Sequence, residues 1–173
     1  PTGAMPVYLD TALFTGPSVN PGWEEGDVSS GQITPIHPIA LESHTVPGKS
    51  TASNPVRPED AAVAAQQAFV DALNAAGKEP GLSFTLAERA TAPTGATEVG
   101  SVESATLFEQ AQHMMLESDN ALAEVLGRYA AITAGREGSA EAAQQRLRGF
   151  CSFFAKKEPK KFQTNKTRQG SLP

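Results

Sequence analysis

The segment HMMLESDNALAEVLGRYAA, residues 113–131, places three small polar residues between two apolar helical patterns. Before them, apolar residues recur at three- and four-residue spacing, namely Leu107, Phe108, Ala111, Met114 and Met115. After them, the same spacing continues until Gly135 through Leu122, Val125, Leu126 and Tyr129. The spacing predicts two helices joined by a short polar corner.

The corner, Ser118-Asp119-Asn120, holds more cap-type residues than one helix start needs. Whichever of the three is the N-cap, the residue three positions later is apolar, so none completes a capping box with Glu or Gln. Two polar side chains are therefore left for another purpose. A hydroxyl and a carboxamide at a helix start can pass a proton and hold a substrate amide, as acyl transfer requires. A simple helix connection is the alternative, because S-x-N also occurs in the Pro/Gly-rich turn at residues 18–20.

The rest of the chain predicts a mixed α+β protein. Short β-favouring runs, VYLDTALF and GQITPIHPIAL, alternate with Gly/Pro turns over residues 7–46. From Pro58 the apolar period becomes helical and ends at Gly77, and a short strand, LSFTLAE, follows at residues 82–88. We therefore divide the chain into a strand- and turn-rich part, residues 1–57, and a part with a helix, a short strand and the helix pair, residues 58–149.

Composition limits the remaining possibilities. The 173 residues are 39% hydrophobic and contain no apolar run near the ~20 residues that span a bilayer, so no transmembrane segment is predicted. The single cysteine, Cys151, excludes an internal disulfide and is interpreted as a small apolar filler. The chain begins at Pro1 without a basic and apolar leader, so any secretion signal is expected to have been removed or to lie outside it.

The last residues, 150–173, differ from the rest in charge. They hold 6 Lys and Arg against 1 acidic residue, whereas residues 1–149 hold 8 against 18. Lys replaces Arg as the usual basic residue there, which predicts a basic tail that is unrelated to the rest or disordered. A nucleic-acid-binding arm is the alternative, but aromatic residues are not interleaved beyond Phe162, so no nucleic-acid partner is predicted.

Other candidate sites are weaker. His37, His44 and His113 have no Cys or Asp partner at a recurrent metal-ligand spacing, so no metal site is predicted. Trp23, in NPGWEEGD, could stack on a sugar, but a lone Trp beside Pro and Gly more often covers a loop.

The wider segment around the corner, SATLFEQAQHMMLESDNALAEVLGRYAA, resembles the second active-site motif of the D-alanyl-D-alanine carboxypeptidase/endopeptidase family, the class C low-molecular-mass penicillin-binding proteins. The shared features are an apolar helix, a Ser-Asp-Asn corner and a helix that opens with an Ala-Glu pair, here Ala123-Glu124. Segments upstream, including YLDTALFTGPSVNPGW and NPVRPEDAAVAAQQAFVDAL, also resemble the family in order. The resemblance covers about residues 7–149.

The resemblance implies part of a penicillin-binding-protein/β-lactamase-like serine acyltransferase fold, with a strand-rich N-terminal part followed by a helical cluster. It implies action on the D-Ala-D-Ala stem peptides of peptidoglycan and binding of β-lactams by the complete enzyme, without a cofactor, in the periplasm or cell envelope. In the motif, Ser118 would relay protons and Asn120 would hold the substrate amide. We assign Asp119 a structural role at the corner, accepting backbone N–H bonds.

The chain also departs from the family pattern. No Ser has a Lys three positions later, so the acylating nucleophile and its base are absent. The third motif is absent too, because Lys166-Thr167-Arg168 has Arg where the family needs Gly. We therefore expect a fragment that is inactive on its own. A non-catalytic envelope module that binds a partner or glycan is the alternative function.

Overall fold

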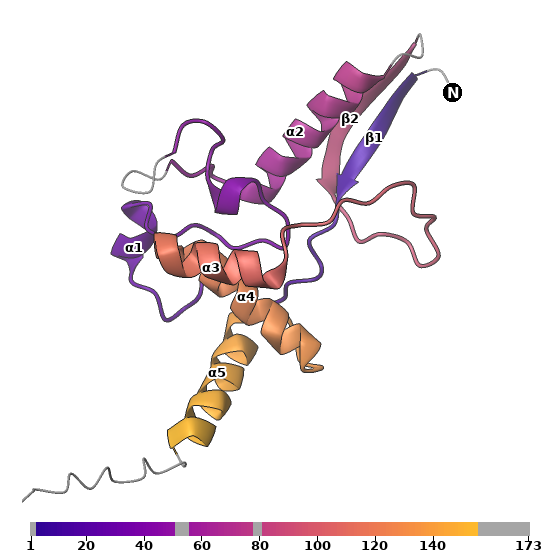
Figure 1. The fold of residues 1–173 in the computed structure, drawn as a ribbon. Coiled ribbons are helices and arrows are strands. Elements are labelled where there is room, and N and C mark those ends of the chain that lie inside the picture. The colour runs from indigo at the N-terminus through magenta and orange to yellow at the C-terminus, as the bar shows by residue number, and fades with distance from the viewer. Residues whose placement is uncertain (1–2, 51–55, 78–80, 156–173) are drawn as a thin grey trace, which may run out of the picture.

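The computed structural model describes residues 3–50, 56–77 and 81–155. The elements follow in the order β1 (Gly3–Leu9), α1 (Glu25–Ser29), η1 (Glu42–His44), α2 (Ala61–Ala76), β2 (Leu82–Arg89), α3 (Leu107–Glu117), α4 (Asn120–Thr133) and α5 (Ala140–Ala155). The two strands and α2 form one end of the molecule, and α3, α4 and α5 gather at the other (Figure 1). The mixed α+β class predicted from the sequence is confirmed.

The strands and α2 make a β-α-β unit. β1 pairs in parallel with β2, from Gly3 opposite Leu82 to Val7 opposite Leu86. Gln66 of α2 is buried and donates to the carbonyl oxygens of both strands, at 2.7 Å from Val7 and 2.9 Å from Ala87. Because a two-stranded sheet is marginal alone, these bonds and the packing of α2 stabilise the pair.

The helix predicted after Pro58 is confirmed as α2. Asp60 is its N-cap, and its carboxylate accepts hydrogen bonds from the backbone N–H groups of Ala62 and Val63. Such a cap contributes about 0.5–2 kcal/mol to helix stability. The strand predicted at residues 82–88 and the helix pair around the corner are confirmed as β2, α3 and α4.

The strand expected over residues 31–41 is wrong. Apart from β1, the described part of residues 1–57 contains no strand. Pro35 and Pro38 lack the N–H groups that a ladder needs, and the Ile36 N–H instead donates to Ser18 O at 2.8 Å. Ile33 and Ile36 are both buried, because the segment crosses the core as an irregular chain.

The helix α5 was not predicted from the sequence. It runs to Ala155, so the boundary expected after residue 149 falls inside a helix. The rest of the expected basic tail, residues 156–173, lies outside the described residues. Within residues 140–148 of α5, Ala140 and Ala143 are buried, and a Cβ added to Gly127 of α4 would lie 3.4 Å from the Cβ of Ala143. Small side chains therefore allow α4 and α5 to approach closely.

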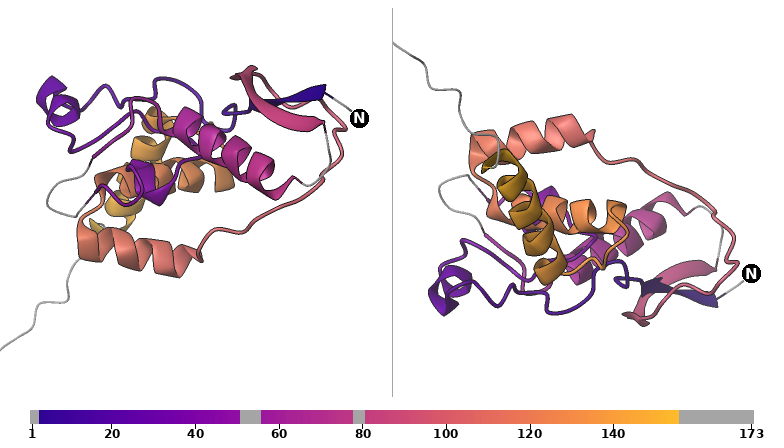
Figure 2. Two further views of the ribbon diagram at one scale, coloured as in Figure 1. Left: turned by 90° about the horizontal axis from the view of Figure 1, so that it is seen from above. Right: turned by 90° about the horizontal axis from the view of Figure 1, so that it is seen from below.

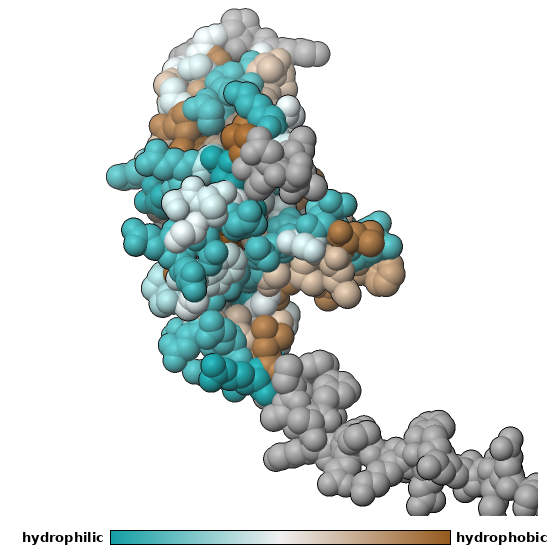
Figure 3. Space-filling view, turned by 90° about the vertical axis from the view of Figure 1, so that its left-hand side faces the viewer, coloured by the Kyte–Doolittle hydropathy of each residue, from teal (hydrophilic) through white to brown (hydrophobic). Residues whose placement is uncertain are grey.

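The core is small and lies beneath the start of α4. Ile33, Ile36 and Ala121 form it, and partly buried side chains pack around them, namely Phe14, Trp23, Val28 and Val125. The long segment that follows β2 returns along the molecule to reach α3 (Figure 2). On the face shown in Figure 3, hydrophobic patches are separated by hydrophilic residues. Within the described ranges, no helix is both long and apolar enough to cross a bilayer.

Replacing Gly138 by alanine is expected to lower the free energy of unfolding by about 1–3 kcal/mol. A Cβ there would lie 2.5 Å from Leu13 O and 2.9 Å from Ile132 Cδ1, so the backbone would have to move. Gly26→Ala is the control, because nothing lies within 4 Å of the added Cβ. Urea denaturation of the two variants measures the difference, and equal midpoints would contradict the close approach at Gly138.

Candidate active site

The polar corner is formed where α3 ends and α4 begins. Ser118 is the C-cap of α3 in the left-handed region, with φ 53° and ψ 44°, and its N–H donates to Met114 O. The Asp119 N–H donates to the same oxygen at 3.0 Å. Left-handed backbone costs a residue with a Cβ about 1–2 kcal/mol, so the corner holds Ser118 in a strained conformation.

Asp119 and Asn120 start the second helix. Asp119 is the N-cap of α4, and its Oδ1 accepts from the Leu122 N–H at 3.0 Å. Asn120 is the first helical residue, and its side chain, like that of Ser118, is exposed. The Asp119 carboxylate is thus used by the helix, while the Ser118 hydroxyl and the Asn120 amide remain accessible.

The corner lines an open cavity of about 1000 Å³. α3 contributes Glu109, Gln110, His113 and Glu117, and α4 contributes Leu122, Val125 and Tyr129 below the corner. The opposite wall is the segment from His37 to Thr45 together with Arg57. A volume of this size lies at the upper end of small-molecule sites, so the cavity can admit an extended peptide.

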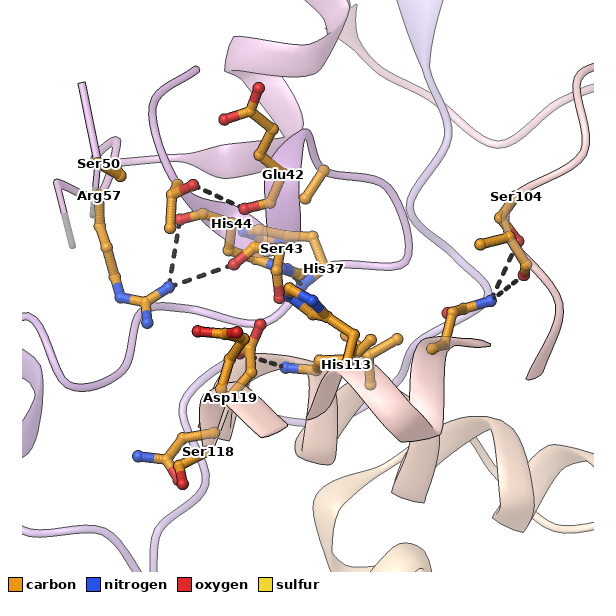
Figure 4. Close-up of a pocket in the computed structure, with 18 of the residues that line it drawn as sticks. His37, Glu42, Ser43, His44, Ser50, Arg57, Ser104, His113, Ser118 and Asp119 are labelled. Atoms are coloured by element: carbon orange, nitrogen blue, oxygen red, sulfur yellow. Dashed lines mark hydrogen bonds between the residues drawn. The ribbon is translucent and has the colours of Figure 1, made fainter. Parts of the chain in front are cut away.

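The wall that faces the corner is a strained turn held by an arginine. Glu42, Ser43 and His44 all have positive φ, at 40°, 54° and 63°. Arg57 Nη1 donates to the carbonyl oxygens of Ser43 and His44, at 3.3 and 3.4 Å, and its Nε donates to Gly31 O at 2.7 Å. Figure 4 shows the Arg57 side chain reaching this turn, with Ser118 and Asp119 at the neighbouring helix start.

Arg57 in one wall of the cavity and Asp119 at the corner carry opposite charges that attract each other. Burial lowers the pKa of Arg57, and the nearby Asp119 carboxylate opposes this shift. The Arg57 hydrogen bonds given by the structure all go to carbonyl oxygens, so its charge contributes a positive potential on the cavity side opposite Asp119.

The His44 imidazole in this wall accepts a hydrogen bond. The backbone N–H of His37 donates to His44 Nε2 at 3.0 Å, so that nitrogen carries no proton. Burial, with a smaller effect of the neighbouring His37, lowers the pKa of His44 from 6.5 to about 4. Burial also lowers the pKa of His37, whose Nε2 lies 3.6 Å from Asp60 Oδ1.

His37, His44 and His113 all line the same cavity, although His113 lies far from the other two in the sequence. Over the described ranges, no set of three or more His, Cys, Asp and Glu side chains is placed to hold a metal ion. Trp23 lies outside the cavity lining and donates through Nε1 to Glu124 Oε1 at 3.2 Å. Its indole therefore attaches a loop to α4, as a loop-covering Trp does.

Comparisons with known proteins agree with the resemblance at the corner. The D-Ala-D-Ala carboxypeptidase 3 (S13) family matches residues 48–151. Carboxypeptidase Rv3627c of Mycobacterium tuberculosis is 32% identical over 145 residues, which are 82% of this chain and 30% of that protein. Carboxypeptidase DacB of Mycolicibacterium smegmatis is 35% identical over 137 residues, 79% of this chain and 28% of that protein.

The chain thus spans less than a third of the length of these two curated relatives. No solved structure matches the chain significantly. The family match covers more than half of the chain and includes the whole helix pair with its Ser-Asp-Asn corner, so this chain belongs to the D-Ala-D-Ala carboxypeptidase S13 family.

Proposed function

We propose that this chain is part of a serine-type D-Ala-D-Ala carboxypeptidase or endopeptidase that acts on peptidoglycan peptides and is acylated by penicillins. The proposal is supported by family membership and by one observation, that the accessible Ser118 and Asn120 side chains line a cavity large enough for a peptide. As a peptidase of the bacterial cell wall, the protein would act outside the cytoplasm, in the periplasm or cell envelope.

The corner supplies two groups to the reaction. The Ser118 hydroxyl can accept and donate a proton, and it would pass the proton between the attacking serine and the leaving amine. The Asn120 carboxamide would donate to and accept from the substrate amide next to the bond that breaks. Asp119 would take no part in proton transfer, because its carboxylate caps α4.

The covalent step needs residues that this chain does not contain. No Ser in its 173 residues has Lys three positions later, and no lysine lines the cavity among the described residues. We therefore propose that the isolated chain does not acylate, and that the corner acts when a Ser–Lys pair is placed against the cavity.

The test is penicillin acylation of the full-length protein that contains this chain. Asn120→Ala is expected to slow acylation about 10-fold or more, which corresponds to ~1.4 kcal/mol of transition-state stabilisation. Ser118→Ala should slow it as well, because the proton relay is lost. A fluorescent penicillin and rapid quenching give the rate.

Gln145→Ala is the matched control, since it removes an exposed carboxamide on α5, outside the cavity lining. An unchanged acylation rate in Asn120→Ala would contradict the role proposed for this residue. The corner would then be a helix connection, and a non-catalytic envelope module would become the better interpretation.

A further inference from the structure

The loop between β1 and α1 passes next to the first turn of α4. We name residues 14–23 of this loop the strap. Its Asn20 is buried and donates from Nδ2 to Glu124 Oε1 at 2.8 Å. Trp23 Nε1 donates to the same carboxylate oxygen at 3.2 Å. Figure 1 shows the chain after β1 passing α4 on its way to α1.

The orientation of the Asn20 amide is determined by its other partners. Its Oδ1 accepts from the Gly22 N–H at 3.0 Å and from Gln144 Nε2 at 3.2 Å. Both partners are donors, so Nδ2 must be the atom that meets the carboxylate of Glu124. The strap therefore joins α4 and α5 through one amide whose donor and acceptor roles are both fixed.

Glu124 lies one helical turn after Asn120 and is not among the residues that line the cavity. Ala121, Glu124 and Arg128 share one face of α4 at helical spacing, and the first and last are fully buried. Leu122, by contrast, lines the cavity. A change in the contacts of the Glu124 carboxylate therefore affects the first helical turn of α4, which begins at the corner.

The strap also holds the opposite wall of the cavity. Ser18 O accepts from the Ile36 N–H at 2.8 Å, and Ile36 immediately precedes His37 in that wall. Ile36 is buried against Ala121, the residue after Asn120. One short loop is therefore bonded to both walls, to α4 through Asn20 and Trp23 and to the histidine segment through Ser18.

We propose that Asn20, Trp23 and Glu124 are positioning residues, which fix the Ser118–Asn120 corner and its distance from the opposite wall. The catalytic consequence rests on the function proposed above, whereas the structural consequence does not. A strained corner needs such support, because exposed residues at a helix junction have few contacts of their own.

The test removes the donor of one hydrogen bond. Asn20→Asp keeps the size and the Oδ1 acceptor but places a second carboxylate against Glu124. At pH 7 the two charges repel, and hydrogen exchange of the Leu122 and Ala123 amides is expected to rise about fivefold or more relative to the unchanged chain.

The double variant Asn20→Asp/Glu124→Gln provides the rescue. The amide then lies on α4 and the carboxylate on the strap, so the hydrogen bond runs in the opposite direction. Exchange at Leu122 and Ala123 should return to within about twofold of the unchanged chain at pH 7. Glu137→Gln, an exposed carboxylate outside this contact, is the control and should change nothing.

Two results would overturn the positioning role. One is unchanged exchange at the corner in Asn20→Asp, and the other is an equal rise in the amides of α2, which would indicate general destabilisation. Acylation of the full-length protein should fall in Asn20→Asp and recover in the double variant. If Asn120→Ala leaves acylation unchanged, the proposed function fails, yet the exchange result still decides whether the strap positions the corner.

Discussion

Arg128→Ala is expected to lower the free energy of unfolding of the chain by about 3–5 kcal/mol, the usual cost of breaking a buried charged network. The Arg128 side chain is 1% exposed. Its guanidinium donates to three carbonyl oxygens that no helix or strand satisfies, those of Thr15, Pro17 and Gly138. Without the guanidinium the Thr15 and Pro17 oxygens would lose this donor, Gly138 O would keep only the Thr15 N–H, and the Glu124 carboxylate would lose the charge 3.9 Å away at Arg128 Nε.

Urea denaturation followed by circular dichroism measures this loss. Arg136→Ala is the control, since Arg136 is exposed and its described side-chain bond goes to Gln145 at 3.1 Å, so the effect should stay within about 0.5 kcal/mol. Arg128→Lys should recover little, because a single ammonium cannot reach carbonyl oxygens on separate segments as a guanidinium does. Equal stability of the Arg128→Ala and Arg136→Ala variants would contradict a supporting role for Arg128.

Lowering the pH from 6.5 to 4 is expected to cost the chain about 3 kcal/mol through His44 alone. The pKa of His44 is about 4 in the folded chain, against the ordinary value of 6.5. The unfolded chain therefore binds more protons in this range. The contribution of neutral His44 is complete above pH 6.5 and is lost as the pH falls toward 4.

His44→Gln is the variant that isolates this effect. Its side-chain oxygen can accept from the His37 N–H but does not titrate, so stability should become flatter between pH 6.5 and 4. The part that remains includes His37, whose pKa is also lowered by burial. The carboxylates with a lowered pKa act mainly at the lower end of this range and below it, because the ordinary value is 3.8 for Asp10 and Asp60 and 4.5 for Glu109. An identical pH profile for His44→Gln would refute the assignment.

The sequence predicts elements whose signal is local and periodic. α2, α3 and α4 repeat apolar residues every three or four positions, and caps mark their starts. The strand predicted over residues 31–41 is wrong, because its buried Ile33, Thr34 and Ile36 belong to an irregular segment that crosses the core. α5 was not predicted because the buried side chains in residues 140–148, Ala140 and Ala143, are small and give a weak periodic signal.

One part of the candidate site can be predicted from the sequence, and the other part cannot. The Ser118–Asn120 corner is contiguous, so its excess of polar residues is visible in the sequence. The opposite wall is assembled from residues about 60 to 80 positions away, and no Gly or Asn announces the positive φ angles of Glu42, Ser43 and His44. Nothing local indicates that Arg57 reaches this turn, because its partners are carbonyl oxygens, which every residue has.

The attachment of the strap to α4 also has a consequence in time. Asn20 and Glu124 are 104 residues apart in the chain, so a ribosome adding about 5–20 residues per second completes the strap roughly 5–20 s before its partner emerges. Until then the indole of Trp23 and the amide of Asn20 remain without their final contacts. Contacts of such long range form late in folding, because the loop must close before they contribute. Trp23 is the sole tryptophan, so its fluorescence during refolding would report when the corner acquires its support.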